Sequence, residues 1–164
     1  RARLGKLVSS ENEVNWWKPE LFDANTRMNI PSEIEIVSPP PNKDKNYNCF
    51  ISVLGLQNSP ELLGNEGWEF TRNLEPVFNE MITKQIIIPV EKPGKGNLIV
   101  YRTDEGNISH VGLMEDDSTV ISKWSWGPLL RHKIFAVPDH YGDTIEFYTL
   151  TQEATDYVLE KRVS

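Results

Sequence analysis

Hydrophobic residues in the second half of the chain fall into short runs that are separated by polar turns. The runs are rich in Ile, Val, Tyr and Thr, and they cover residues 86–90, 97–102, 108–114, 119–124 and 144–149. Short runs of this composition predict β-strands. The connections at 103–107 and 115–118 are short and polar, which is typical of antiparallel strands that follow one another as a meander.

Helical patterns lie on both sides of these predicted strands. Residues 68–84 carry apolar side chains three and four positions apart, with Pro76 as a kink or restart point. Residues 59–64 predict a short helical turn, because they begin with a serine cap and a proline and end with glycine. A final helix is predicted over 151–162. Helices followed by an antiparallel sheet indicate an α+β fold.

The first 41 residues differ in pattern from the rest. Residues 1–41 are expected to form an N-terminal arm and proline-rich linker, and residues 42–164 the folded domain. The run Ser38-Pro39-Pro40-Pro41 is stiff and extended, so the arm either links to another part or lies across the domain. Trp16 and Trp17 are expected to anchor it. The arm is also the candidate contact with a parent polypeptide or a protein partner.

Size and composition exclude several classes of function. With 164 residues, 38% hydrophobic and 25% charged, the chain is expected to fold as one compact, soluble domain, and no apolar stretch approaches the roughly 20 residues that span a bilayer. A net charge of −7 and a pI near 5.0 argue against nucleic acid as a partner. One cysteine excludes an internal disulfide framework. The compartment stays open between the cytoplasm and secretion as an effector.

The candidate chemistry lies in one cysteine and one histidine. Cys49 follows a polar, turn-prone stretch and opens an apolar run that predicts a helix. Backbone N–H groups and the helix dipole at such a position favour thiolate over thiol. His110 lies inside a predicted strand, and the two residues together indicate a nucleophile and its base. Alternatively, Cys49 is a small buried hydrophobe and His110 a hydrogen-bonded structural residue.

A base of this kind needs a third group that fixes its tautomer, and that group is expected on the next strand. Lys123 lies opposite His110 if the connecting loop has four residues, whereas a shift of one residue selects Ser122. A protonated Lys123 is unable to accept a hydrogen bond from the imidazole. The backbone N–H of Cys49, with Asn48 or Tyr47, is the candidate donor to a developing oxyanion. Asn48 serves equally well as a helix cap.

These residues resemble those of a known family. The resemblance lies in Asn48-Cys49-Phe50 opening a helix, then Gly96-Asn97-Leu98-Ile99-Val100-Tyr101, then Ser109-His110-Val111-Gly112-Leu113 and an adjacent strand. This layout resembles the papain-fold thiol hydrolases of the NlpC-like peptidase type, over roughly Tyr47 to Lys123.

The resemblance implies a fold in which N-terminal helices carrying the cysteine pack on an antiparallel sheet carrying the histidine. It also implies that Cys49 is the nucleophile and His110 the base. The family's third position, usually His, Asn or Gln, falls at Ser122, which is a departure from the family pattern. A serine there accepts a hydrogen bond from the imidazole with less charge and reach than the usual partner.

Two tryptophans close behind the third position are candidates for substrate binding. Trp124 and Trp126 either wall a substrate cleft or anchor a loop by packing. The remaining histidines, His132 and His140, stand in no ligand pattern, so no metal and no organic cofactor is expected.

The expected function is therefore a cysteine-dependent amide hydrolase, a peptidase or amidase that works through an acyl-thioester intermediate. Its expected substrate is a peptide or a protein. One alternative is a catalytically inactive papain-fold binding module. A second alternative is an effector or toxin domain that modifies a target protein through the same thiol, for instance by deamidation.

Overall fold

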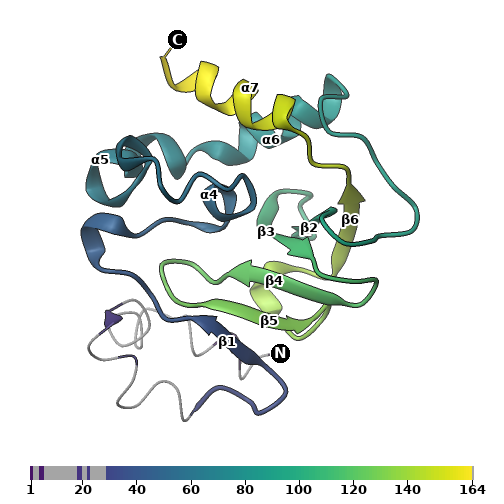
Figure 1. The fold of residues 1–164 in the computed structure, drawn as a ribbon. Helices are drawn as coiled ribbons and strands as arrows, with labels where there is room; N and C mark the ends of the chain where they lie inside the picture. The colour runs from purple at the N-terminus through teal and green to yellow at the C-terminus, as the bar shows by residue number, and fades with distance from the viewer. Residues whose placement is uncertain (2–3, 6–17, 20–21, 23–28, 164) are drawn as a thin grey trace.

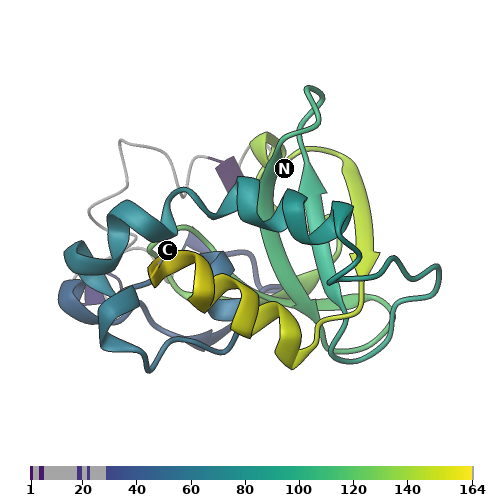
Figure 2. The same ribbon diagram turned by 90° about the horizontal axis from the view of Figure 1, so that it is seen from above.

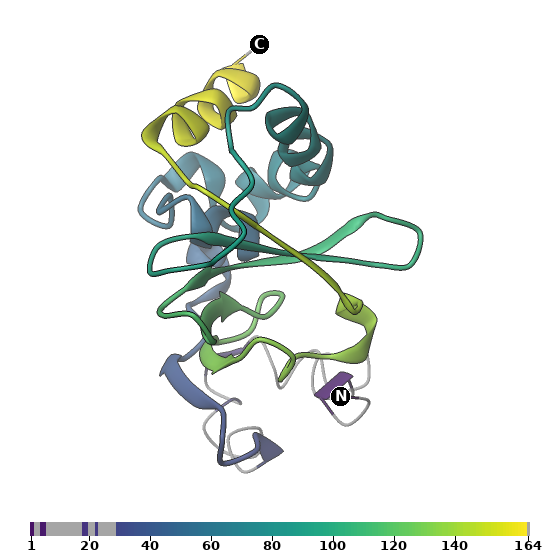
Figure 3. The ribbon, with the colours of Figure 1, turned by 90° about the vertical axis from the view of Figure 1, so that its right-hand side faces the viewer.

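A computed structural model describes residues 1, 4–5, 18–19, 22 and 29–163 of the chain (Figure 1). Within these residues, four α-helices accompany one six-stranded sheet in which every pair of neighbours is antiparallel. Figures 1 and 3 show α5, α6 and α7 gathered on one side of the molecule and β1 on the opposite side. The expected α+β class is confirmed.

The sheet has the strand order β1-β5-β4-β3-β2-β6. Its strands are β1 (Glu35–Ser38), β2 (Leu98–Arg102), β3 (Ile108–Met114), β4 (Thr119–Lys123), β5 (Leu129–Lys133) and β6 (Thr144–Tyr148). Strands β2 to β4 form the expected meander, β5 continues it, and β6 pairs with the free side of β2. Four of the five predicted strands are confirmed to within a residue at each end.

The fifth predicted strand, at 86–90, is wrong. This segment makes only an isolated bridge between Pro89 and Tyr148. Proline has no backbone N–H to donate to a ladder, so it does not extend regular pairing. Conversely, β1 and β5 were not expected, because β1 has only four residues and β5 has few apolar ones.

The helices are α4 (Cys49–Val53), α5 (Gly64–Thr71), α6 (Leu74–Thr83) and α7 (Gln152–Val163). The predicted turn at 59–64 is confirmed as a 3-10 helix, η4 (Pro60–Leu62), although Gly64 begins the next helix. The single helix expected over 68–84 is two helices that meet at 72–73. Pro76 lies in the first turn of α6, where a missing N–H costs no helical hydrogen bond.

Helices α6 and α7 lie side by side, as the view from above shows (Figure 2). The carboxylate of Glu80 on α6 accepts a hydrogen bond from Lys161 of α7 at 3.1 Å and a shorter one from Tyr157. No helix among the residues that the structure describes has both the length and the apolar character needed to cross a bilayer.

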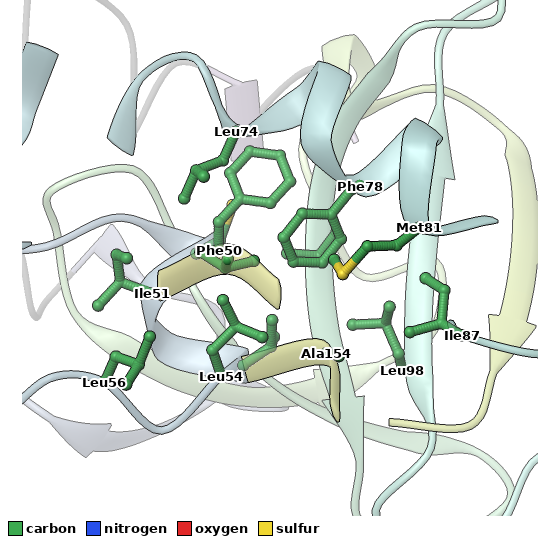
Figure 4. Packing of buried hydrophobic residues seen from close by; sticks show 14 of the residues in the cluster. Phe50, Ile51, Leu54, Leu56, Leu74, Phe78, Met81, Ile87, Leu98 and Ala154 are labelled. Atoms are coloured by element: carbon green, nitrogen blue, oxygen red, sulfur yellow. The ribbon is translucent and has the colours of Figure 1, made fainter. Parts of the chain in front are cut away.

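The sheet separates two hydrophobic cores. Strand alternation sends Leu98 and Val100 of β2 toward the helices and Ile99 and Tyr101 to the other face. The helix-side core joins α4, α6 and α7 to the sheet, and Figure 4 shows ten labelled members: Phe50, Ile51, Leu54, Leu56, Leu74, Phe78, Met81, Ile87, Leu98 and Ala154.

The N-terminal segment belongs to the core on the far face. Leu4, Phe22 and Ile34 are buried there, and β1 pairs with β5 at the edge of the sheet. Trp16 and Trp17, the expected anchors of the arm, lie outside the described residues. The segment before residue 42 thus contributes both a strand and core side chains.

Candidate active site

Helix α4 begins at Cys49 because Asn48 caps it. The side-chain oxygen of Asn48 accepts a hydrogen bond from the N–H of Ile51 at 3.2 Å, and its amide donates to the carbonyl of Thr71 at 2.9 Å. This arrangement is the capping role weighed for Asn48 in the sequence. Its amide group is thereby already engaged with the protein's own backbone.

Cys49 is buried, with 8% of its surface exposed. Hydrogen bonds from the backbone N–H groups of Val111, Cys49 and Phe50 lower the pKa of the thiol, but burial raises it more, to about 11. The expected preference for thiolate is therefore not found in this structure. Helix α4 has only five residues, so the field at its N-terminus is outweighed by desolvation.

Lys123 lies on the same face of the sheet as Cys49 and is almost fully buried. Its Nζ atom donates to Oδ1 of Asn46 at 2.8 Å and to the carbonyl of Gly127 at 2.5 Å, and it lies 4.9 Å from the ring centroid of Tyr47. Burial lowers the pKa of Lys123 to about 7, and the neighbouring Cys49 acts in the opposite direction. Cysteine, lysine and tyrosine thus form one cluster at the start of α4.

His110 lies on the other face of the sheet. It pairs with Tyr101 across the β2–β3 ladder, and its ring stacks on Tyr141 with centroids 4.2 Å apart and planes at 15°. Tyr141 belongs to a 3-10 helix, η5 (Asp139–Tyr141). The Nε2 atom of His110 is buried without a hydrogen-bond partner, and burial holds the pKa of the ring well below its usual value.

Cys49 and His110 lie on opposite faces of the sheet, and no hydrogen bond joins their side chains. One of the backbone N–H groups that lower the pKa of the thiol belongs to Val111, the residue directly after His110. Successive side chains on a strand point to opposite faces, so the imidazole leaves the strand away from α4. Tyr141 interacts with both residues: its ring stacks on that of His110, and the charge of Cys49 contributes to the raised pKa of Tyr141.

The register between β3 and β4 differs from both expected registers. The turn is one residue shorter than the four-residue loop assumed, since Glu115 and Thr119 are already paired. When this register is continued along both strands, Trp124 is the residue opposite His110. Neither Ser122 nor Lys123 hydrogen-bonds to the imidazole, because its Nε2 atom has no partner and both side chains have other ones.

Ser122 is instead part of a buried network with His132. Its Oγ atom lies 2.7 Å from Nε2 of His132 and accepts a hydrogen bond from Nε1 of Trp124 at 3.0 Å. Trp124 is fully buried, so it packs in the core on the far face and has no surface to offer a substrate. Trp126 is half-buried, and its ring meets that of Trp68 edge to face at 5.3 Å.

A cleft of about 780 Å³ lies beside this region without including the cysteine. It is lined by Lys43, Asp44, Lys45, Gln57, Asn58, Pro60, Leu63, Asn65 and Glu66. The described residues contain no group of three or more His, Cys, Asp or Glu side chains that is arranged to hold a metal ion.

Sequence reasoning missed three residues of the site: Asn46, His132 and Tyr141. Asn46 stands in the polar stretch directly before Cys49, which was a usable signal. His132 and Tyr141 lie between the predicted strands at 119–124 and 144–149, in segments that carry no such signal.

No protein-family model matches the chain, and neither a curated protein nor a solved structure matches it significantly.

Proposed function

We propose that the chain is a cysteine-dependent amide hydrolase, a peptidase or amidase with a papain-like arrangement of the NlpC-like type. In this proposal Cys49 is the nucleophile and His110 the base. The observation that carries it is the packing of α4, which begins at Cys49, against β3, the strand that carries His110. Two segments that are remote in sequence meet there.

Two further observations support the proposal. Nearly all buried polar atoms in proteins have a hydrogen-bond partner, and Nε2 of His110 is an exception that a role in proton transfer would explain. In addition, the β3–β4 ladder ends at Leu113 and Ile121, while α4 packs against both strands. Helix α4 therefore brings the sulfur to the face of the sheet that carries Lys123, against the strand that carries His110.

The proposed reaction uses these groups in sequence. The imidazole must first turn from the far face of the sheet toward the sulfur; the thiol proton then passes to Nε2 of His110, and the sulfur attacks the amide carbonyl to form a tetrahedral oxyanion. The main-chain N–H of Cys49 donates to that oxyanion, with Tyr47 as the second candidate, since the side chain of Asn48 is engaged as a cap. The imidazolium returns its proton to the leaving amine, and water then releases the acyl group from sulfur.

The proposal is tested with p-nitrophenyl acetate, an activated acyl donor that needs no knowledge of the natural substrate. We expect the native protein to release p-nitrophenolate at a rate that Cys49→Ala abolishes and His110→Ala lowers by roughly 100-fold, the usual contribution of a general base. His140→Ala is the matched control, because His140 is exposed, and it should retain the native rate. Equal rates for the native protein and Cys49→Ala would contradict the proposal.

The second candidate is a catalytically inactive binding module with the same arrangement of helices and sheet. It is favoured by the burial of the sulfur and by the raised pKa of the thiol. If it is correct, Cys49→Ala changes the stability of the protein and leaves the release of p-nitrophenolate at the level of the native protein.

A further inference from the structure

We propose that residues 137–143 form an autoinhibitory latch, which holds the imidazole of His110 on the face of the sheet opposite Cys49. The latch includes η5 and its Tyr141. This inference rests on the proposed function, because it takes His110 as the base of Cys49, and it adds the regulation of that site. The arrangement described here is the latched form, and release of the latch lets the imidazole turn toward the sulfur.

The grip on the imidazole is the first step of the argument. The ring of Tyr141 stacks on that of His110, with centroids 4.2 Å apart and planes at 15°, and the ring centroid of Tyr101 lies 5.6 Å from that of the imidazole. All three side chains are buried, and packing of this kind fixes the orientation of a ring. Nε2 of His110 has no hydrogen-bond partner among the described residues. Turning the ring therefore breaks no hydrogen bond at the atom that must take the thiol proton.

The attachment of the latch to the sheet is the second step. The hydroxyl of Ser109, the residue before His110, donates a hydrogen bond to the carbonyl of Tyr141. The next residue of the latch, Gly142, is so close to β2 that a Cβ atom there would lie 1.9 Å from the carbonyl oxygen of Arg102. The latch is therefore fixed directly against β2 and β3, the strands on which the imidazole lies.

The side chain of Arg1 is the third step, because it ties the two ends of the latch together. Its guanidinium donates to the carbonyls of Val137 and Pro138 at 3.3 Å each. It also donates to the carbonyl of Gly142 at 2.7 Å and forms an ion pair with Asp143. A guanidinium has five N–H donors, so one side chain is able to make all these contacts. The side chain of Arg1 is 25% exposed, so a competing ligand is able to reach this clasp.

The end of the β3–β4 ladder is the fourth step. Its pairs reach Leu113 and Ile121, so no ladder hydrogen bond joins the two strands at His110. The imidazole is able to turn around this side of β3 once Tyr141 no longer packs on it. The latch also explains why a thiol whose pKa is raised by burial and an imidazole without a partner at Nε2 occur together. In the latched form the base does not reach the sulfur.

The first experiment measures the rate of alkylation of Cys49 by iodoacetamide between pH 6 and pH 10. Tyr141→Leu removes the stacked ring and keeps an apolar side chain. We expect the apparent thiol pKa to fall in this variant and the rate at pH 7.5 to rise at least about tenfold, because the released imidazole takes up the thiol proton. Tyr141→Phe keeps the stacked ring and should match the native profile. Superimposable profiles for the native protein and Tyr141→Leu would overturn the inference.

A double variant separates release of the base from simple loosening of the core. In His110→Ala there is no imidazole to release, so adding Tyr141→Leu should leave the alkylation rate within about twofold of that of His110→Ala alone. A rise of about tenfold in this background as well would overturn the inference. It would show that Tyr141→Leu merely exposes the thiol.

The clasp is tested by a variant that leaves the core unchanged. In Arg1→Met we expect the alkylation rate at pH 7.5 to exceed the native rate at least about threefold, the effect of one lost hydrogen bond. Arg72→Met is the matched control, because Arg72 is exposed and its ion pair is with Glu69. An Arg1→Met rate equal to the native one would overturn the inference. Alkylation uses no acyl donor, so failure of the hydrolase proposal, seen as p-nitrophenolate release that Cys49→Ala leaves unchanged, is observed separately.

Discussion

His132 is the residue whose ionisation we expect to limit the stability of the protein in acid. Its ring is 2% exposed, with Nε2 at 2.7 Å from Ser122 Oγ and Nδ1 at 2.8 Å from the carbonyl of Lys133. A carbonyl only accepts, so Nδ1 carries the proton and Nε2 accepts from the Ser122 hydroxyl. Burial lowers the pKa of His132 to about 4. A second proton at Nε2 would replace that hydrogen bond with a buried charge.

The size of the effect follows from the proton affinities of the folded and unfolded chains. An unfolded histidine has a pKa near 6.5, so it binds a proton before the native His132 does. The neutral His132 ring makes its full contribution to the free energy of unfolding above about pH 6.5, and this contribution is lost as the pH falls toward about 4. At about 1.4 kcal/mol per pH unit, the loss is about 2 kcal/mol at pH 5 and about 3 kcal/mol at pH 4.

The assay is urea unfolding of the native protein and of His132→Gln at pH 7, 6, 5 and 4. Glutamine does not ionise, and its amide oxygen is able to accept the hydrogen bond from Ser122. Carboxylates titrate alike in both proteins, so their contribution cancels in the difference between the two curves. We expect the native protein to lose about 3 kcal/mol more than His132→Gln between pH 7 and pH 4.

The control is His140→Gln, because His140 is exposed on η5. Its free energy of unfolding should follow the native pH dependence. Parallel curves for the native protein and His132→Gln would refute the reasoning, since they would mean that the buried imidazole takes up its proton as easily in the folded chain as in the unfolded one.

Two further predictions concern backbone and core. Gly142 has φ +91°, and a Cβ there would lie 1.9 Å from the carbonyl oxygen of Arg102, so Gly142→Ala should lower the free energy of unfolding by more than about 2 kcal/mol. Gly96 has φ +86°, but a Cβ there would meet no atom within 4 Å, so Gly96→Ala should lower it by only about 1 kcal/mol. Urea unfolding that ranks these two variants alike would contradict this account. Phe78 is fully buried and Phe135 is 48% exposed, so thermal unfolding should show Phe78→Ala destabilised by about 3–5 kcal/mol and Phe135→Ala by less than about 1 kcal/mol. Similar losses for both would show that the helix-side core tolerates the cavity.

The strands that were predicted correctly are those whose signal is local. Strands β2 and β3 are rich in Ile, Val and Leu, and polar turns bound them, so composition alone marks them. Strand β5 contains Arg131, His132 and Lys133 among its five residues, so its apolar content is too low to mark it. Its pairing with β1 joins Arg131 to Glu35, a distant contact that no short window of sequence contains.

The candidate site likewise has features that adjacent residues determine and features that only the folded structure determines. The start of α4 at Cys49 and the cap at Asn48 depend on a few adjacent residues, and both were predicted. The partner of His110 depends on the length of one turn, and an error of one residue moves every side chain of a strand to the other face. The burial of Lys123 was not predictable from its residue type, because lysine is ordinarily exposed.

The most direct test of the central claim is to locate the acyl group after reaction with p-nitrophenyl acetate. The reaction is quenched in acid within the first turnover, and the digested protein is mapped by mass spectrometry. We predict a single acetyl group as a thioester on Cys49, which hydroxylamine removes. Acetyl groups scattered over exposed lysines, with Cys49 unmodified, would contradict the assignment of this buried thiol as a nucleophile.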